Sequence, residues 1–379
     1  MTITNTDFQN IALAISAYAD EAYTSERKLN STGIVGMRDD ITADGESFIG
    51  QMRWYQPLAA NINVASLSNA ADGTYTDITT QVSNYIKTVR TFGAKQVNLQ
   101  EVVSKQDGLA KIARDFGEVR AQDEHNALLS VLKGVAASEV ALGDFGGTDG
   151  NGLAGGEGGL LSFDTDPDTA ATGFFVDINA AGEFGLAATN STDARRLFDS
   201  TAIGAARGER LFRAVGMAFK DYEPDYMYMV TSPENMAEFR AANLVDETAV
   251  TDGNLVFSTI FGGKFRLIPT RANQMISGAA AGDLNVMSTK ATFIVKPSAV
   301  SFAPVNVPTP VEVERAAAAY TGGGSTDIWY RWGSIMHPMG YDWVGATNVF
   351  ASNATLGAAA SYGRKVSALN LGILPIFHS

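Results

Sequence analysis

The sequence predicts an α+β fold, in which one long helix and several groups of strands follow one another along 379 residues. Three observations favour this class. Apolar residues recur at spacings of three and four from Leu109 to Leu142, which is typical of an amphipathic helix. β-rich runs precede that helix, and two strand-like runs separated by a glycine loop lie near the C-terminus. With 45% hydrophobic residues, the chain can fill a sizeable core.

The composition limits the classes of function. The chain has no cysteine, so disulfide frameworks and thiolate metal sites are excluded. A net charge of -13 argues against a surface that binds nucleic acid by neutralising phosphates. Residues 1–50 carry 3 basic and 8 acidic side chains, and residues 143–193 carry 9 acidic and none basic. We interpret these segments as an arm and an insertion held out in water; an ordinary solubilising surface is the alternative.

The N-terminal part predicts an arm followed by a hairpin. Residues up to Glu46 lack sustained periodicity, apart from one short helix near Phe8 to Tyr23, and they contain no basic, apolar export signal. The β-rich runs 48–64 and 81–99 flank an Asp72-Gly73 turn signal and predict a long two-stranded excursion. Because an isolated hairpin is marginal in water, we expect a neighbouring subunit to cover it. The candidate subunit contacts are Arg53, Trp54, Tyr55, Tyr85, Lys87 and Arg90.

The central part predicts one long helix and then a mixed region. Gly117 and Gly134 lie inside the helical pattern, where we expect them to bend it. After the glycine-rich loop 143–159, the run Tyr226–Val230 is typical of a buried strand, and Ser232-Pro233 of a helix start. The remaining strands are expected at 261–270, 284–289 and 291–304, and a hairpin of runs 311–320 and 327–336 at the end.

The stretch RWGSIMHPMGYDWVG, residues 331–345, resembles either the floor of an active site or a structural wall, and we interpret it as wall. Both faces of the preceding strand are largely apolar, as in a strand covered on two sides. The four residues 337–340 predict a type I turn that His337 caps with a hydrogen bond. The expected turn and core residues are Trp332, His337, Pro338, Gly340 and Trp343.

No catalytic, cofactor-binding or metal site is predicted, and we expect no enzyme. The alternating Asp164, Asp166 and Asp168 lack the glycine and glutamate that a calcium loop needs further on. The glycine-rich loop lacks the Gly-Lys-Ser/Thr ending of a phosphate loop. Asp123, Glu124 and His125 interrupt the helix stripe, but adjacent helical residues fan out instead of converging on a metal, which favours a solvated or interface helix.

The order of these parts resembles the major capsid protein of tailed bacteriophages, the Hong Kong 97-type shell fold. Three local stretches are similar to that family: 226–243, the pair 261–274 and 281–297, and HPMGYDW at 337–343. The resemblance implies six parts. They are an N-terminal arm (1–47), an extended hairpin loop (48–98), a spine helix of the peripheral domain (99–142), an acidic Gly-rich insertion or loop (143–193), an axial domain (194–305), and return strands with a C-terminal segment (306–379).

The resemblance also implies a function. It implies that the chain self-assembles as hexamers and pentamers into the icosahedral head shell around double-stranded DNA, without sequence-specific contacts, membrane or cofactor. Portal, scaffolding or decoration proteins are the other implied partners, and the implied location is the virion capsid, assembled in the host cytoplasm. An encapsulin-like nanocompartment shell and a surface-layer protein remain alternatives. No lysine or asparagine matches the cross-linking pair that some family members use.

Overall fold

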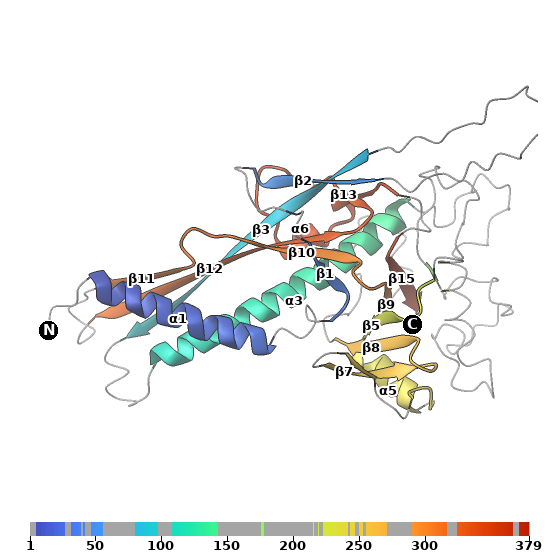
Figure 1. Ribbon diagram of the computed structural model, residues 1–379, viewed down its shortest axis with the longest axis horizontal. Coiled ribbons are helices and arrows are strands. Elements are labelled where there is room, and N and C mark those ends of the chain that lie inside the picture. Colours follow the sequence, from blue (N-terminus) through green and yellow to red (C-terminus); the bar gives the residue numbers. More distant parts are fainter. Residues whose placement is uncertain are drawn as a thin grey trace, which may run out of the picture.

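The computed structural model describes residues 5–26, 32–38, 41, 47–55, 80–97, 108–142, 176–177, 215, 219, 223–241, 243–246, 250–252, 255–270, 290–316, 324–366 and 371–378. These residues form a mixture of helices and strands, which confirms the α+β class. The first sheet lies along one long helix, α3 (Gly108–Leu142), and the second sheet lies beside the C-terminal half of that helix (Figure 1). α3 has 35 residues and is unbroken, so the single long helix predicted from Leu109 to Leu142 is confirmed.

The two glycines of α3 let neighbouring segments pack closely against the helix, and the helix continues unbroken through both of them. A Cβ atom at Gly117 would lie 2.6 Å from the Cβ atom of Ala22, and one at Gly134 would lie 2.6 Å from Cε2 of Tyr362. The added Cβ atom would also clash with a backbone carbonyl oxygen at each position, that of Ala19 at Gly117 and that of Leu356 at Gly134. The glycines therefore permit close packing on opposite halves of the helix, whereas the sequence predicted bends there.

The first sheet has six strands in the order β1-β10-β12-β3-β2, with β11 pairing with the far end of β12. Its strands are β1 (Val35–Met37), β2 (Ile49–Tyr55), β3 (Thr80–Val97), β10 (Val300–Val305), β11 (Val311–Ala316) and β12 (Ser325–Pro338). β2 and β3 pair antiparallel, and so do β11 and β12, which confirms both predicted hairpins in the described residues.

Strand β3 is divided between two partners. Its first part, up to Ile86, pairs with β2, and its second part, from Lys87 to Val97, pairs with β12. The sequence predicted an excursion along its whole length. A strand of 18 residues is longer than either partner, so its beginning belongs to the hairpin and the rest pairs with β12.

The second sheet has seven strands in the order β4-β15-β9-β5-β8-β7-β6. They are β4 (Val176–Asp177), β5 (Met227–Thr231), β6 (Val250–Asp252), β7 (Leu255–Ile260), β8 (Phe265–Pro269), β9 (Lys290–Val295) and β15 (Ile373–His378). Strand β5 is buried throughout, as predicted. Helix α5 (Pro233–Ala241) follows it. The Ser232 hydroxyl accepts a hydrogen bond from the backbone N–H of Asn235 at 3.2 Å, which confirms the predicted cap. The strand expected at 284–289 lies outside the described residues.

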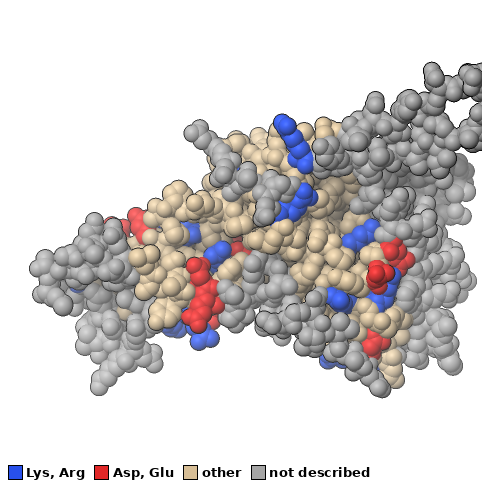
Figure 2. Space-filling view, in the orientation of Figure 1, with Lys and Arg blue, Asp and Glu red and all other residues tan. Residues whose placement is uncertain are grey.

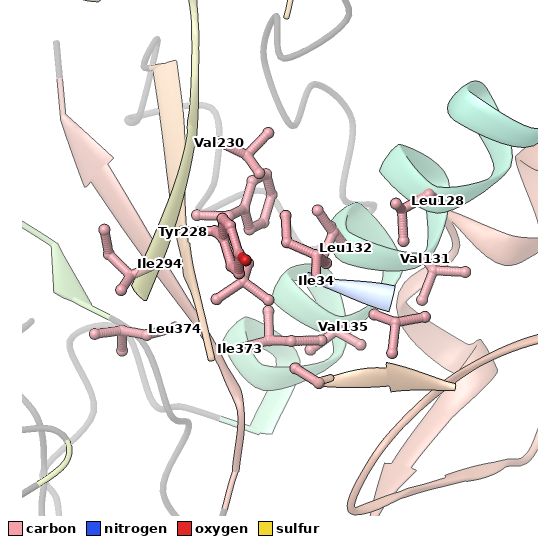
Figure 3. Close-up of a cluster of buried hydrophobic side chains, with 14 of the residues drawn as sticks. Ile34, Leu128, Val131, Leu132, Val135, Tyr228, Val230, Ile294, Ile373 and Leu374 are labelled. Carbon is pink, nitrogen blue, oxygen red and sulfur yellow. The ribbon is translucent and has the colours of Figure 1, made fainter. Parts of the chain in front are cut away.

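One half of α3 supplies the main core. Leu128, Val131, Leu132 and Val135 of the helix share one buried cluster with Tyr228 of the second sheet, and Leu132 lies on the side of the helix toward Tyr228 (Figure 3). The other half of α3 packs on the first sheet, where the ring of Phe116 stacks on that of Tyr330 with centroids 5.4 Å apart. Helix α3 therefore joins two hydrophobic cores.

The N-terminal helix α1 (Asn5–Glu26) also packs against α3, and it is longer than the short helix predicted. Its Ile15 and Ala19 are buried, and the Tyr23 hydroxyl donates to Oε2 of Glu124 at 2.5 Å. In the described residues this helix is therefore not held out in water, because its apolar stripe finds a partner within the chain. Apart from β4, the acidic segment 143–193 lies outside the described residues, and the six predicted part boundaries stay predictions.

Four small elements complete the described chain. Strand β13 (Tyr341–Trp343) pairs antiparallel with β14 (Tyr362–Arg364). Helix α6 (Asn353–Leu356) and the 3₁₀ turn η5 (Ala359–Ser361) connect them and contact α3. The segment that follows β12 is thereby packed against α3.

The close approach at Gly134 leads to a test. Gly134→Ala removes the usual helix penalty of glycine, which is worth about 1 kcal/mol, but it places a methyl group against Tyr362. We expect a net loss of about 1–3 kcal/mol in the free energy of unfolding, as for an overpacked core. Gln122→Ala, at an exposed position of the same helix, is the control and should change that free energy by less than about 0.5 kcal/mol. Denaturant unfolding measures both; a stabilised Gly134→Ala would contradict the packing described.

Candidate functional site

The C-terminal stretch that the sequence singled out forms the end of β12, a turn and β13. Residues His337 and Pro338 continue β12, where they pair with Ser301 and Val300 of β10. The turn therefore lies at Met339-Gly340, later than the predicted type I turn starting at His337. Pairing with β10 extends the strand through the proline, which a strand tolerates at its end. Gly340 has φ +88°, a conformation that favours glycine.

The His337 side chain is buried in the protein interior and is only 2% exposed. It hydrogen-bonds with the backbone of Tyr341, across the turn, and its ring lies 6.4 Å from that of Tyr85. Burial lowers the pKa of His337 to about 4, partly offset by the Tyr341 bond and by nearby Asp342, while Arg38 lowers it further. The imidazole is therefore neutral at physiological pH.

Two tryptophans of the same stretch are core residues. Trp343 is 3% exposed, meets the ring of Tyr362 edge-on at 5.5 Å, and donates from Nε1 to the Ala346 carbonyl at 3.1 Å. Trp332 lies on β12 beside Tyr330, and its Nε1 donates to Oδ2 of Asp123 at 3.2 Å. Both indole N–H groups are satisfied, as burial requires.

Asp123 is the centre of a polar junction between four elements. Besides the Trp332 bond from β12, its carboxylate lies 3.6 Å from Nε of Arg90 on β3 and accepts from Nδ2 of Asn353 on α6 at 3.3 Å. Arg90 also donates to Oδ1 of Asn353 at 2.9 Å and to the Ala351 carbonyl at 2.6 Å. The junction fixes β3, β12 and α6 against α3.

The neighbours of Asp123 point to other partners. Glu124 is buried against Tyr23 of α1, and a ring nitrogen of His125 lies 3.1 Å from the Thr270 hydroxyl, with burial lowering the His125 pKa. The three residues therefore fan out, as predicted, and each contacts a different part of the chain. In the part of the chain that the structure describes, no group of three or more such side chains could hold a metal ion.

The predicted subunit contacts divide into two groups. Tyr85 and Lys87 are buried within the chain, and Arg90 belongs to the Asp123 junction. Lys87 and Arg90 make intramolecular contacts because β3 runs on beside β12, which the sequence pattern did not distinguish from a free hairpin. Tyr85 belongs to the hairpin itself and is buried because one face of the hairpin packs on Ala303 and Ile335. Arg53 is exposed on β2 and stays a predicted subunit contact. The side chains of Trp54 and Tyr55 lie outside the described residues.

A buried carboxylate that sequence reasoning missed closes the far end of α3. Glu139 is fully buried, and its Oε2 lies 3.6 Å from Nη1 of Arg364 on β14. Burial, followed by the charge of Glu139, raises the pKa of the Tyr341 hydroxyl well above its ordinary value. The only available signal was an acidic residue on the apolar face of the predicted helix.

Large apolar side chains remain exposed on several separate elements. They include Leu13 (70%) and Tyr18 (58%) on α1, Val82 (39%) on the β2–β3 hairpin, Trp329 (42%) on β12, and Val344 (56%) and Val349 (51%) after β13. On the face shown in Figure 2, most of the described surface is uncharged, and the acidic and basic side chains lie in small mixed groups.

Comparisons with known proteins concern the fold. No family model matches the chain, and no curated protein matches it in sequence. Among solved structures, the chain is similar to a chain from the capsid of Ralstonia phage GP4, with 12% identity, a TM-score of 0.47 and coverage of 92% of this chain and 88% of that one.

Two further capsid structures show the same degree of similarity. The cyanophage Pam1 capsid matches with 12% identity, a TM-score of 0.46 and coverage of 93% and 92%. The acid-stable capsid of Helicobacter pylori bacteriophage KHP30 matches with 10% identity, a TM-score of 0.44 and coverage of 91% and 89%. At these identities no residue role is transferred to this chain.

Among the described residues, no helix is long and apolar enough to cross a membrane.

The packing of Trp343 leads to a second test. Trp343→Ala removes a buried indole from between β13 and β14, and we expect it to lower the free energy of unfolding by about 3–5 kcal/mol and to yield aggregated or unassembled protein. His337→Gln is the companion variant, since it keeps a hydrogen-bonding group at the turn and should still fold and assemble. A chemical turnover that His337→Gln abolished while folding stayed normal would contradict the structural role of this stretch.

The burial of His337 predicts a dependence of stability on pH. Its pKa is about 4 in the folded protein and 6.5 ordinarily, so the unfolded chain binds the proton more tightly. The contribution is fully present above pH 6.5 and is lost as the pH falls toward 4, at a cost on the order of 3 kcal/mol. We expect denaturant unfolding of His337→Gln to lose less stability than the unaltered protein between those pH values. Equal losses of unfolding free energy in the two proteins would contradict a role of His337 in this pH dependence.

Proposed function

We propose that this chain is the major capsid protein of a tailed bacteriophage, which self-assembles into the icosahedral head shell around a double-stranded DNA genome. One observation carries the proposal. Strand β3 is anchored by its second part in the first sheet, while its first part continues with β2 into a two-stranded hairpin at the edge of the molecule (Figure 1). One face of this ribbon packs within the chain, where Met52 and Tyr85 are buried, and Arg53 and Val82 on its other face stay exposed, where a neighbouring copy would cover them.

The rest of the described structure supports a structural role. A long helix braced against two sheets provides a stiff frame, and its buried polar groups are engaged in holding elements together, as at Asp123. The exposed apolar side chains on separate elements are suited to contacts in several directions, as hexamers and pentamers of a closed shell require. A shell confines DNA without specific phosphate contacts, so the acidic composition is compatible with this role.

The proposal includes partners and a location. Portal protein and, during assembly, scaffolding or decoration proteins complete such a head, which is assembled in the host cytoplasm and becomes the virion capsid. A nanocompartment shell of similar design encloses enzymes, whereas a phage head encloses nucleic acid, so the contents of purified particles distinguish the two.

The proposal is tested by expressing the chain and measuring assembly. We expect closed particles or capsomers by negative-stain microscopy and light scattering, and double-stranded DNA inside particles purified from infected cells. A chain that stays monomeric at high concentration, at every salt concentration and pH, would rule the proposal out.

A charge reversal on the hairpin sharpens this test. Arg53→Glu changes an exposed residue of β2, so the free energy of unfolding should shift by less than about 0.5 kcal/mol while the yield of particles falls sharply. Lys111→Glu, on the N-terminal turns of α3 with a side chain 73% exposed, is the matched control and should leave assembly intact. Normal assembly of Arg53→Glu would remove Arg53 from the subunit contacts.

A further inference from the structure

We infer that the outer face of α1 pairs antiparallel with α1 of a second copy of this chain, about a two-fold axis. This inference rests on the proposed shell function and names one of its contacts. It concerns a surface that the hairpin argument does not use, on a helix that the sequence predicted as a short helix within an arm.

The outer face of α1 is a continuous apolar strip. The helix buries Ile15, Ala19 and Tyr23 toward α3. The strip from Leu13 to Tyr18 faces the other way: Leu13 is 70% exposed, Tyr18 is 58% exposed, and Ala14 and Ala17 between them are exposed as well. Residues three and four apart share a helix face, so these four form one uncharged patch.

The strip stands on a rigid support. Nη1 of Arg120 on α3 lies 3.3 Å from the Asp20 carboxylate, and its guanidinium lies 4.0 Å from the centre of the Tyr23 ring. Tyr23 donates to the buried Glu124, and Gly117 lets the two helices approach closely. Because α1 is already ordered against α3, a partner binds the strip without a further cost of ordering the helix.

The strip is self-complementary in position. Helix α1 runs from Asn5 to Glu26, so its midpoint lies between Ile15 and Ser16, and the strip Leu13–Tyr18 has the same midpoint. A two-fold axis through that point brings position 13 opposite 18 and position 14 opposite 17, with the full length of both helices in register. Alanine at 14 and 17 allows an interaxial distance of about 8 Å.

The charges of α1 select the antiparallel arrangement. The helix contains no lysine or arginine, and its exposed acidic residues Asp20 and Glu21 lie in the second half. A parallel pair would place these carboxylates against their own copies, at a cost. In the antiparallel pair they lie opposite positions 11 and 10, which are uncharged in the sequence. A second copy of the same helix therefore fits the strip in one orientation only.

The absence of cysteine permits a direct test by cross-linking. Ala14→Cys and Ala17→Cys chains, with tags of different mass, are mixed in equal amounts, assembled and exposed to a mild thiol oxidant. Cα atoms about 5–6 Å apart form disulfides readily, as positions 14 and 17 across the axis would. We expect clearly more mixed pairs than the about half that random pairing yields, because position 14 lies level with position 17 of the partner helix but about 4.5 Å along the helix from its own copy. Mainly like-with-like pairs, or no disulfides in intact assemblies, would overturn the inference.

Two variants control for chance contact. Lys111→Cys, with a highly exposed side chain on α3, should stay reduced under the same conditions. Leu13→Asp, added to both cysteine chains, should leave the unfolding temperature unchanged because Leu13 is exposed, and should abolish the mixed disulfide. Undiminished cross-linking with Leu13→Asp would overturn the inference.

The outcomes separate this inference from the shell function. Shells that form without the mixed disulfide leave the shell function standing and refute the α1 contact. Mixed disulfides in a protein that forms dimers but never capsomers or shells support the α1 contact and refute the shell function.

Discussion

Hydrophobic contact along one unbroken helix holds the molecule together, because α3 is the element that both sheets touch. Its C-terminal half fills the core beneath the seven-stranded sheet, around Leu128 and Leu132, and its N-terminal half packs Phe116 against Tyr330 of the six-stranded sheet. A helix with apolar residues on both halves can do this only where its neighbours approach closely. Gly117 and Gly134 allow that approach to α1 and to the segment around Tyr362. The relative position of the two sheets therefore depends on the unbroken course of α3.

Polar groups specify how the elements meet along this helix. Asp123 lies near the middle of α3 and binds side chains from β3, β12 and α6, whereas Glu139 near its end pairs with Arg364 of β14. Buried charged groups add little net stability, but removing one partner leaves the other unpaired at a large cost. Such junctions penalise a shifted register of β12 or a displaced α6 more than they stabilise the correct one. Packing thus provides the stability, and the junctions provide the specificity.

Periodic patterns predicted the elements well, and the long-range contacts less so. The helix from Leu109, the buried strand at Met227–Thr231 and the Ser232 cap depend on local residue order, and the structure contains all three. The sequence pattern could not predict that β3 is divided between two partner strands, because apolar and polar residues alternate in the same way in a free hairpin and in a sheet. For the same reason Lys87 and Arg90, expected at a subunit contact, contact the chain itself, and Tyr85 is buried because one face of the hairpin packs on Ile335. The turn after β12 was misplaced because pairing with β10 extends the strand through Pro338.

The division between buried and exposed groups suits a building block of an assembly. His337, the histidine at the centre of the C-terminal wall, is neutral and packed against Tyr85, so its polarity serves the turn and not a substrate. The apolar side chains left exposed lie instead at the periphery, on α1, on the hairpin and after β13. A frame fixed by α3 holds these edges at constant positions relative to one another. Contacts made at one edge then determine where the next copy is placed, which is the geometric requirement for a closed shell.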